Sequence, residues 1–207
     1  MSQNKFVSQF TVTEAVAVKQ LKDDLPHILT EAFGNSDVYT LWGVPLDKES
    51  NDERIDVVLV KFLRASQGRE LNIPIAKTML IAMLKWRKEF SADTVLEEEF
   101  DTTVFNDTIG FLYRTDKEDR PVTYNFYGKL DQHVVFADVN KFIRWRVQLM
   151  EKGVQHVDFV SIDSMVQVHD YLGASIFGRT TNAKEATNIL IKLMQDNYPE
   201  FLVICIV

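Results

Sequence analysis

Apolar residues recur with a helical period through the first half of the chain. Between residues 52 and 65 they fall at positions i, i+3, i+4, i+7 and i+8, the spacing of one face of an α-helix. These residues are Ile55, Val58, Leu59, Phe62 and Leu63. The same period runs through residues 11–33, where Pro26 interrupts it, and resumes at Pro74. Residues 1–100 are therefore expected to form an N-terminal helical region.

After residue 100 the pattern changes to runs of β-branched and aromatic residues. Strands are expected at 108–113, 121–128, 166–177 and 201–207, and helices at 137–152 and 183–197. Helices that alternate with strands predict a largely parallel sheet, because parallel neighbours are joined by helical crossovers. The expected fold class is α/β, with a helical layer followed by a mixed, largely parallel sheet over residues 101–207 that helices pack against.

His169 and Tyr171 lie two residues apart in the expected strand 166–177. Alternate side chains of a strand share a face, so the imidazole and the phenol project into one space. One interpretation is a hydrogen-bonded pair inside a core. The other is an iron site, because a tyrosinate serves as an axial ligand of haem and a neighbouring histidine supports it.

Arg146 interrupts the apolar stripe of the helix expected at 137–152. A guanidinium directed at a core is costly unless it meets an anion, and its planar fork suits a carboxylate or a phosphate. Asp158 and Asp170 are candidate internal partners, and a side chain that reaches out to water is another explanation. The functional alternative is a ligand anion, either a haem propionate or the phosphodiester of a phospholipid.

Composition narrows the classes of function. The chain has 207 residues, 46% of them apolar, and a net charge of −7, which argues against binding to nucleic acid and supplies no polybasic anchor. The lone cysteine, Cys205, excludes an internal disulfide and suits a reducing compartment. No apolar run reaches the length of a signal sequence core or a membrane span. We expect a cytosolic protein whose membrane contacts are peripheral.

Several tracts resemble the CRAL-TRIO family of lipid-carrying proteins, over a region from about Asp52 to Glu200. The family tracts are Val60–Ala65, Leu84–Phe90, Pro121–Gly128 and Tyr198–Glu200. Two more, Phe142–Gly153 and Gln167–Gly173, are most similar to the fungal fifth-homologue branch of the yeast phosphatidylinositol transfer proteins. The resemblance implies a non-classical phosphatidylinositol transfer protein that also binds haem b. It also implies cytoplasmic location with peripheral association to endoplasmic reticulum or microsomal membrane, and links to phosphoinositide homeostasis and the oxidant response.

The resemblance assigns roles to five residues. Tyr171 would be the axial ligand of ferric haem, with His169 beside it on the same face. Arg146 would meet a propionate, and Tyr127 would contact the macrocycle or its periphery. Glu200 matches the acidic residue that helps hold the inositol headgroup in lipid-transferring relatives.

The end of the chain departs from the family pattern. Family members place a lysine a few residues after the Tyr-Pro-Glu tract, and Cys205 stands near that place here. In the family the sheet continues further and a helix follows that gates the lipid cavity. The chain stops at Val207 on an apolar strand, so we expect a shortened version whose lipid exchange is impaired.

Three classes of function remain open at this point. The first is a binding and transfer protein without covalent chemistry. The second is a haem enzyme of catalase or peroxidase type, which would need an acid-base group on the open face of the iron. The third is a scaffold with a collapsed core. We find no Ser-His-Asp order, no Gly-rich phosphate loop and no His-Glu-x-x-His spacing.

Overall fold

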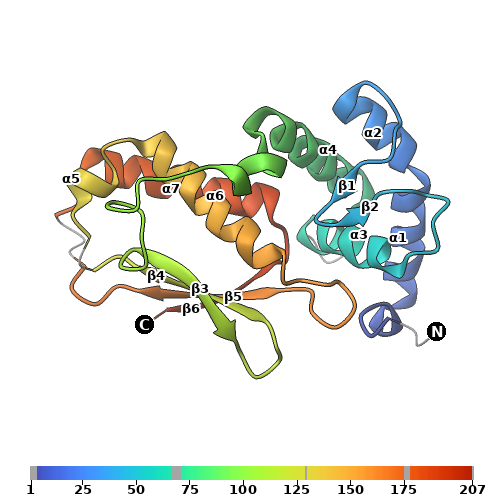
Figure 1. The fold of residues 1–207 in the computed structure, drawn as a ribbon. Helices are drawn as coiled ribbons and strands as arrows, with labels where there is room; N and C mark the ends of the chain where they lie inside the picture. Colours follow the sequence, from blue (N-terminus) through green and yellow to red (C-terminus); the bar gives the residue numbers. More distant parts are fainter. Residues whose placement is uncertain (1–3, 67–70, 129, 175–177, 207) are drawn as a thin grey trace. The chain divides into compact units, whose positions relative to one another are not determined.

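The computed structural model describes residues 4–66, 71–128, 130–174 and 178–206, with side chains of the last strand described as far as Val203. The chain divides into two units, each drawn in Figure 1. The first comprises Met1–Ser91, Asp158–Asp163 and Pro199–Phe201, and the second comprises Ala92–Val157, Ser164–Tyr198 and Leu202–Val207. Two short segments that are distant in sequence therefore belong to the first unit.

The first unit is mainly helical, as the apolar period predicts. Its elements are η1 (Val7–Gln9), α1 (Val12–Asp23), α2 (Leu25–Phe33), β1 (Thr40–Leu41), β2 (Val44–Pro45), α3 (Glu53–Ala65) and α4 (Ile73–Phe90). Polar side chains begin three of the helices: Thr11 forms a capping box with Glu14, and Asp52 and Asn72 accept backbone hydrogen bonds at the starts of α3 and α4. The stripe of α3 predicted from the sequence is buried.

Lys61 of α3 joins the two returning segments to this unit. Its side chain is almost fully buried, and Nζ donates to the backbone oxygen of Glu200 at 3.0 Å and lies 3.5 Å from Asp163 Oδ2. Burial lowers the pKa of the ammonium group, and the charge of Asp163 opposes that shift. Lys61 is thus the partner of one backbone carbonyl and one carboxylate that lie far from it in the sequence.

The second unit is a four-stranded sheet with helices. Its elements are η2 (Ala92–Glu97), β3 (Gly110–Thr115), β4 (Pro121–Phe126), α5 (Gln132–Val135), α6 (Val139–Val154), β5 (Met165–Asp170), α7 (Thr181–Asn197) and β6 (Leu202–Ile206). The strand order is β3-β4-β5-β6, in which β3 is antiparallel to β4 and the other pairs are parallel. This confirms the predicted α/β class with a mixed, largely parallel sheet.

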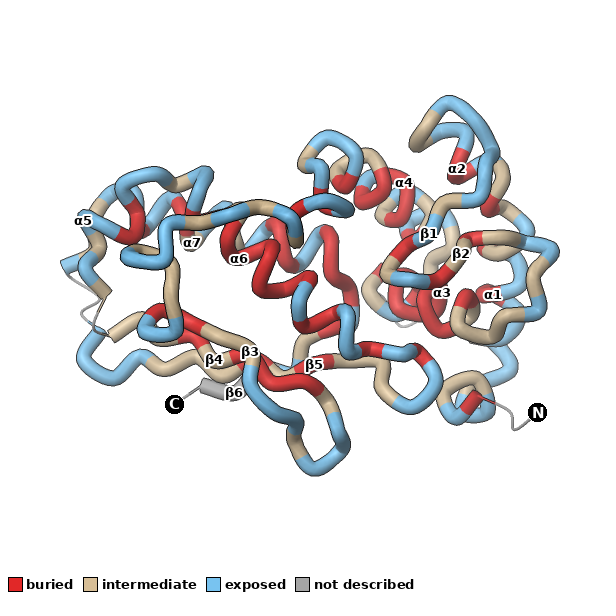
Figure 2. Tube along the Cα trace, in the orientation of Figure 1, coloured by how far each residue is buried: buried red, intermediate tan, exposed pale blue. Residues whose placement is uncertain are grey.

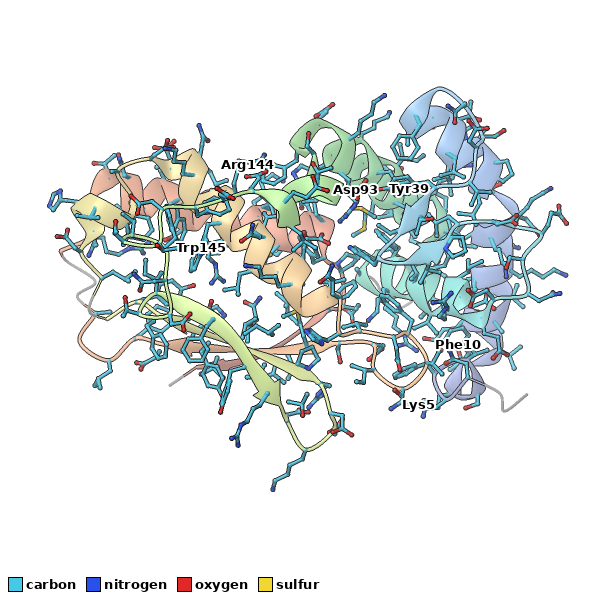
Figure 3. All side chains as sticks on the ribbon, in the orientation of Figure 1. Lys5, Phe10, Tyr39, Asp93, Arg144 and Trp145 are labelled. Atoms are coloured by element: carbon cyan, nitrogen blue, oxygen red, sulfur yellow. The ribbon has the colours of Figure 1, made fainter. Side chains whose placement is uncertain are left out.

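Helices α6 and α7 lie on the same side of the sheet (Figure 1). Asp138 and Thr180 cap them, and α6 is buried along much of its length (Figure 2). Its outer side carries Arg144, which forms an ion pair with Glu98 (Figure 3). The inner side of α6 covers the face of β4 that bears Thr123 and Asn125, both of which are buried.

The expected strand over residues 166–177 is too long. Strand β5 ends at Asp170, because the carboxylate of Asp170 accepts a hydrogen bond from the backbone N–H of Leu172 at 2.7 Å and turns the chain. The turn continues through Gly173, whose φ of +87° is accessible mainly to glycine. Residues 175–177 of the expected strand lie outside the described residues.

Candidate functional site

The ends of β4 and β5 bring together three of the predicted site residues. The two strands are parallel and in register, with Asn125 opposite His169 and Phe126 opposite Asp170. The backbone N–H of Tyr127 donates to the oxygen of Asp170 at 2.8 Å, which extends the pairing one residue beyond the strand. Because side chains alternate along both chains, Tyr127, His169 and Tyr171 reach the same side.

Their rings form a stacked group. The Tyr127 ring lies 5.7 Å from that of His169, with an interplanar angle of 7°, and 5.1 Å from that of Tyr171 at 23°. The His169 and Tyr171 rings are 6.5 Å apart. Tyr171 lies just beyond the end of β5 and keeps 49% of its surface exposed. Tyr171 is therefore about half exposed while its ring packs against its neighbours.

Arg146 reaches the same face of the sheet from α6. It is 3% exposed, its Nη1 donates to Asn125 Oδ1, and its guanidinium carbon lies 5.9 Å from the Trp145 ring. Within the described parts of the chain it forms no ion pair, and its Nε has no hydrogen-bond partner. The buried cation is therefore in contact with neutral groups.

Neither carboxylate considered as an internal partner is paired with Arg146. Asp170 accepts from the backbone N–H of Leu172, as described above. Asp158 accepts from three backbone N–H groups and from the hydroxyl of Ser161 in its own loop. The ion pair with Asp158 or Asp170 is thus not formed. At 3% exposure the guanidinium does not reach out to water either, and the ligand anion stays a prediction.

Burial and nearby charges shift the pKa values of His169 and Tyr171. Burial, reinforced by the positive charge of Arg146, lowers the pKa of His169 to about 4, so its imidazole is neutral near pH 7. Its Nδ1 is buried without a partner in the described structure. Burial and the neighbouring Tyr127 raise the pKa of Tyr171, whereas Arg179 and Arg146 act in the opposite direction. Arg146 thus influences both His169 and Tyr171.

Two residues of this site could hold a haem, whereas a bare ion needs several protein ligands. In the described residues no group of three or more His, Cys, Asp and Glu side chains could hold a metal ion. A haem brings four nitrogen ligands of its own, so it needs one axial residue and partners for its carboxylates. Tyr171, which is about half exposed, and Arg146, with its orphaned buried Nε, match those two needs.

A cavity of about 540 Å³ lies next to this ring group in the second unit. Its lining includes Val104, Ile109, Phe126, Val135, Asp170 and Leu172. Neither Arg146 nor its neighbours in sequence line this cavity. Tyr127, His169 and Tyr171 do not line it either, although residues adjacent to them in sequence do. Strand alternation explains this, because neighbours of an inward-facing residue point to the other side. The alternation in 121–128 was visible in the sequence, but the loop that encloses the cavity was not.

Two further predicted residues lie elsewhere. Glu200 belongs to the first unit, is exposed, and contributes its backbone oxygen to Lys61. The backbone of Cys205 pairs with Val168 in the sheet, but the side chain lies outside the described residues. The residue that sequence reasoning overlooked is Asn125, which lies on the Tyr127 face and bonds to Arg146.

Comparisons of this chain with known proteins agree on one family. The CRAL/TRIO domain family matches residues 105–207. Patellin-3 of Arabidopsis thaliana is 35% identical over 199 residues, which cover 89% of this chain and 39% of that protein. A phosphatidylinositol transfer protein, sfh5 of Aspergillus fumigatus, is 36% identical over 203 residues, covering 90% and 46%. The chain thus spans less than half the length of these relatives.

A solved structure extends the comparison to three dimensions. The crystal structure of Sfh5 matches with a TM-score of 0.80 and 30% sequence identity, covering 95% of this chain and 70% of that one. The match includes both the helical region and the sheet. No helix in the described residues is long and apolar enough to span a bilayer.

Proposed function

This chain belongs to the CRAL/TRIO family, and from that premise we propose that it is a phosphatidylinositol transfer protein that also binds haem b, at the site formed by Arg146 and the ring group. The observation that carries the proposal is the buried Arg146, which has no anionic partner in the described structure and lies against the face that bears Tyr127, His169 and Tyr171. A phospholipid phosphodiester and a haem propionate both supply the missing anion. Relatives whose names state phosphatidylinositol transfer support the lipid assignment.

In the haem complex, Tyr171 would be the axial ligand and Arg146 would bind a propionate. When bound, the haem supplies a ferric iron that accepts a phenolate as ligand. The raised pKa of Tyr171 means that the free protein keeps the phenol protonated at neutral pH, so binding would release a proton. Tyr127 would stack at the edge of the macrocycle, and His169 would offer its unpartnered Nδ1 from the same side.

We favour a carrier over a catalase- or peroxidase-type enzyme. His169 stacks beside Tyr127 and lies on the same face as Tyr171, so it would help to hold the haem rather than serve as a separate acid-base group. The carrier would work in the cytoplasm and contact the endoplasmic reticulum membrane peripherally. Rapid consumption of peroxide by the haem-loaded protein would favour the enzyme instead.

Absorption spectroscopy tests the haem assignment. Protein purified from cells or loaded with haemin should show a ferric-haem band that disappears in Tyr171→Phe. Tyr124→Phe is a matched control, because Tyr124 lies on β4 and stacks on Phe111 rather than with Tyr171. A colourless wild type, or a band unchanged in Tyr171→Phe, would contradict the assignment.

The lipid assignment has a separate test. Wild-type protein should accelerate transfer of labelled phosphatidylinositol between vesicles, and Arg146→Met should slow that transfer because the phosphodiester loses its cationic partner. A wild type with no effect on the transfer rate would show that this chain does not carry the lipid.

A further inference from the structure

Asn125 connects the strand pair to the buried guanidinium. The side chain is 0% exposed, and its Nδ2 donates to the backbone oxygen of Val168 on β5 at 3.1 Å. Its Oδ1 accepts from Arg146 Nη1. One amide therefore uses its donor to bond to the neighbouring strand and its acceptor to hold the guanidinium.

The chemistry of the amide matters at this position. An aspartate has nearly the same shape and would offer the guanidinium a carboxylate, which is the usual partner of a buried arginine. Asparagine provides the acceptor atom without the negative charge. The positive charge of Arg146 consequently stays uncompensated in the described structure, and its Nε–H remains unused.

We propose that Asn125 is a positioning residue that sets the ligand specificity of the site around Arg146: it orients the Arg146 guanidinium without neutralising it, so that the site selects ligands carrying an oxyanion. The inference rests on the proposed function, because it concerns the same site. It goes beyond that function by naming the residue that makes the site selective for negatively charged ligands. The shared chemistry is a carboxylate or a phosphodiester, and the two sources are distinguished by separate arms of the test.

The first arm uses haemin and its dimethyl ester with the full chain. The two probes have the same macrocycle and iron, but the ester has no carboxylates. Asn125→Asp should weaken haemin binding by about 10- to 100-fold, since an internal carboxylate then occupies the guanidinium. Binding of the dimethyl ester should stay within about twofold of wild type. The second arm compares phosphatidylinositol with diacylglycerol of the same acyl chains, and Asn125→Asp should weaken only the phosphatidylinositol complex.

Two further variants separate charge from structure. Asn125→Leu removes the acceptor without adding charge, so it should weaken haemin binding less than Asn125→Asp does. Thr123→Val is the matched control, because Thr123 is buried on the same face of β4 and its hydroxyl donates to Val166 at 3.3 Å, the equivalent bond to β5. It should leave the preference of the site for haemin over the ester unchanged.

A readout independent of both proposed ligands completes the test. Addition of inorganic phosphate should shift the ¹H–¹⁵N resonance of Arg146 Nε in the wild type but not in Asn125→Asp. If Asn125→Asp binds both members of each probe pair as wild type does, or loses them equally, the inference is overturned. If wild type binds neither haemin nor phosphatidylinositol, the proposed function fails, and the phosphate response alone decides the inference: a shift supports it and its absence overturns it.

Discussion

Replacing Arg146 should leave the fold of the ligand-free protein intact although the residue is 3% exposed. In Arg146→Met, the loss of an unpartnered buried Nε–H removes an unfavourable contribution of about 1–3 kcal/mol. The same change leaves Asn125 Oδ1 without its donor, which costs a similar amount, about 1–3 kcal/mol. The two effects are opposed, so the free energy of unfolding should change by less than about 1 kcal/mol.

The double variant Arg146→Met/Asn125→Leu removes both polar groups together. Its remaining cost is the hydrogen bond from Asn125 to the Val168 oxygen, about 1 kcal/mol. We therefore expect the double variant to be as stable as wild type or more stable by about 1–2 kcal/mol, as found where buried ionic groups are replaced by apolar ones. With a urea dependence of about 2 kcal/mol per molar, the midpoint should rise by up to about 1 M.

Urea denaturation of the ligand-free proteins, followed by tryptophan fluorescence, measures these differences. Arg144→Met is the control on the same helix, because Arg144 lies on the outer side and pairs with Glu98 at the surface. It should destabilise by at most about 1 kcal/mol. If Arg146→Met destabilises by more than about 3 kcal/mol, Arg146 is held by a compensated internal pair and the reasoning is refuted.

Two other predictions concern packing and pH. Gly128→Ala should destabilise the protein by at least about 2 kcal/mol in thermal denaturation, because its Cβ would lie 1.7 Å from the backbone oxygen of Leu172. Gly153→Ala should cost clearly less, because its Cβ would meet only the flexible end of Met165. Equal losses of stability in the two variants would contradict this prediction. Burial opposes ionisation of Asp158, but hydrogen bonds to its carboxylate hold its pKa down to about 2, so the stability it contributes should be present above about pH 4 and lost as pH falls towards 2. Asp158→Asn should lack this part of the pH dependence in acid unfolding, and an unchanged profile would argue against it.

The sequence predicted the fold well where one periodicity runs through a whole element. The stripe of α3 and the composition of β4 correspond to real elements because each reflects burial of a complete face. The apolar run after Glu200 likewise forms a strand, β6. The predicted end of β5 was wrong because a side chain determines where the strand stops. The Asp170 carboxylate accepts a hydrogen bond from the backbone N–H of Leu172, which competes with continued strand pairing.

The candidate site was accessible to sequence reasoning only in part. Arg146 was conspicuous because a charge interrupts an apolar stripe, and the two-residue spacing placed His169 and Tyr171 on one side. Asn125 gave no comparable signal, since an asparagine in a strand is unremarkable until its partner on another element is known. A pocket beside the strand 121–128 was expected, but the part of its wall that comes from residues 103–109 was not, because this loop has no periodic pattern.

The burial of Lys61 also bears on how the protein is made. Its backbone partner at Glu200 lies 139 residues later in the chain. At roughly 5–20 residues per second, about 7–28 seconds separate the synthesis of these two residues. Burial of the Lys61 ammonium with this backbone partner therefore has to wait until nearly the whole chain has been made.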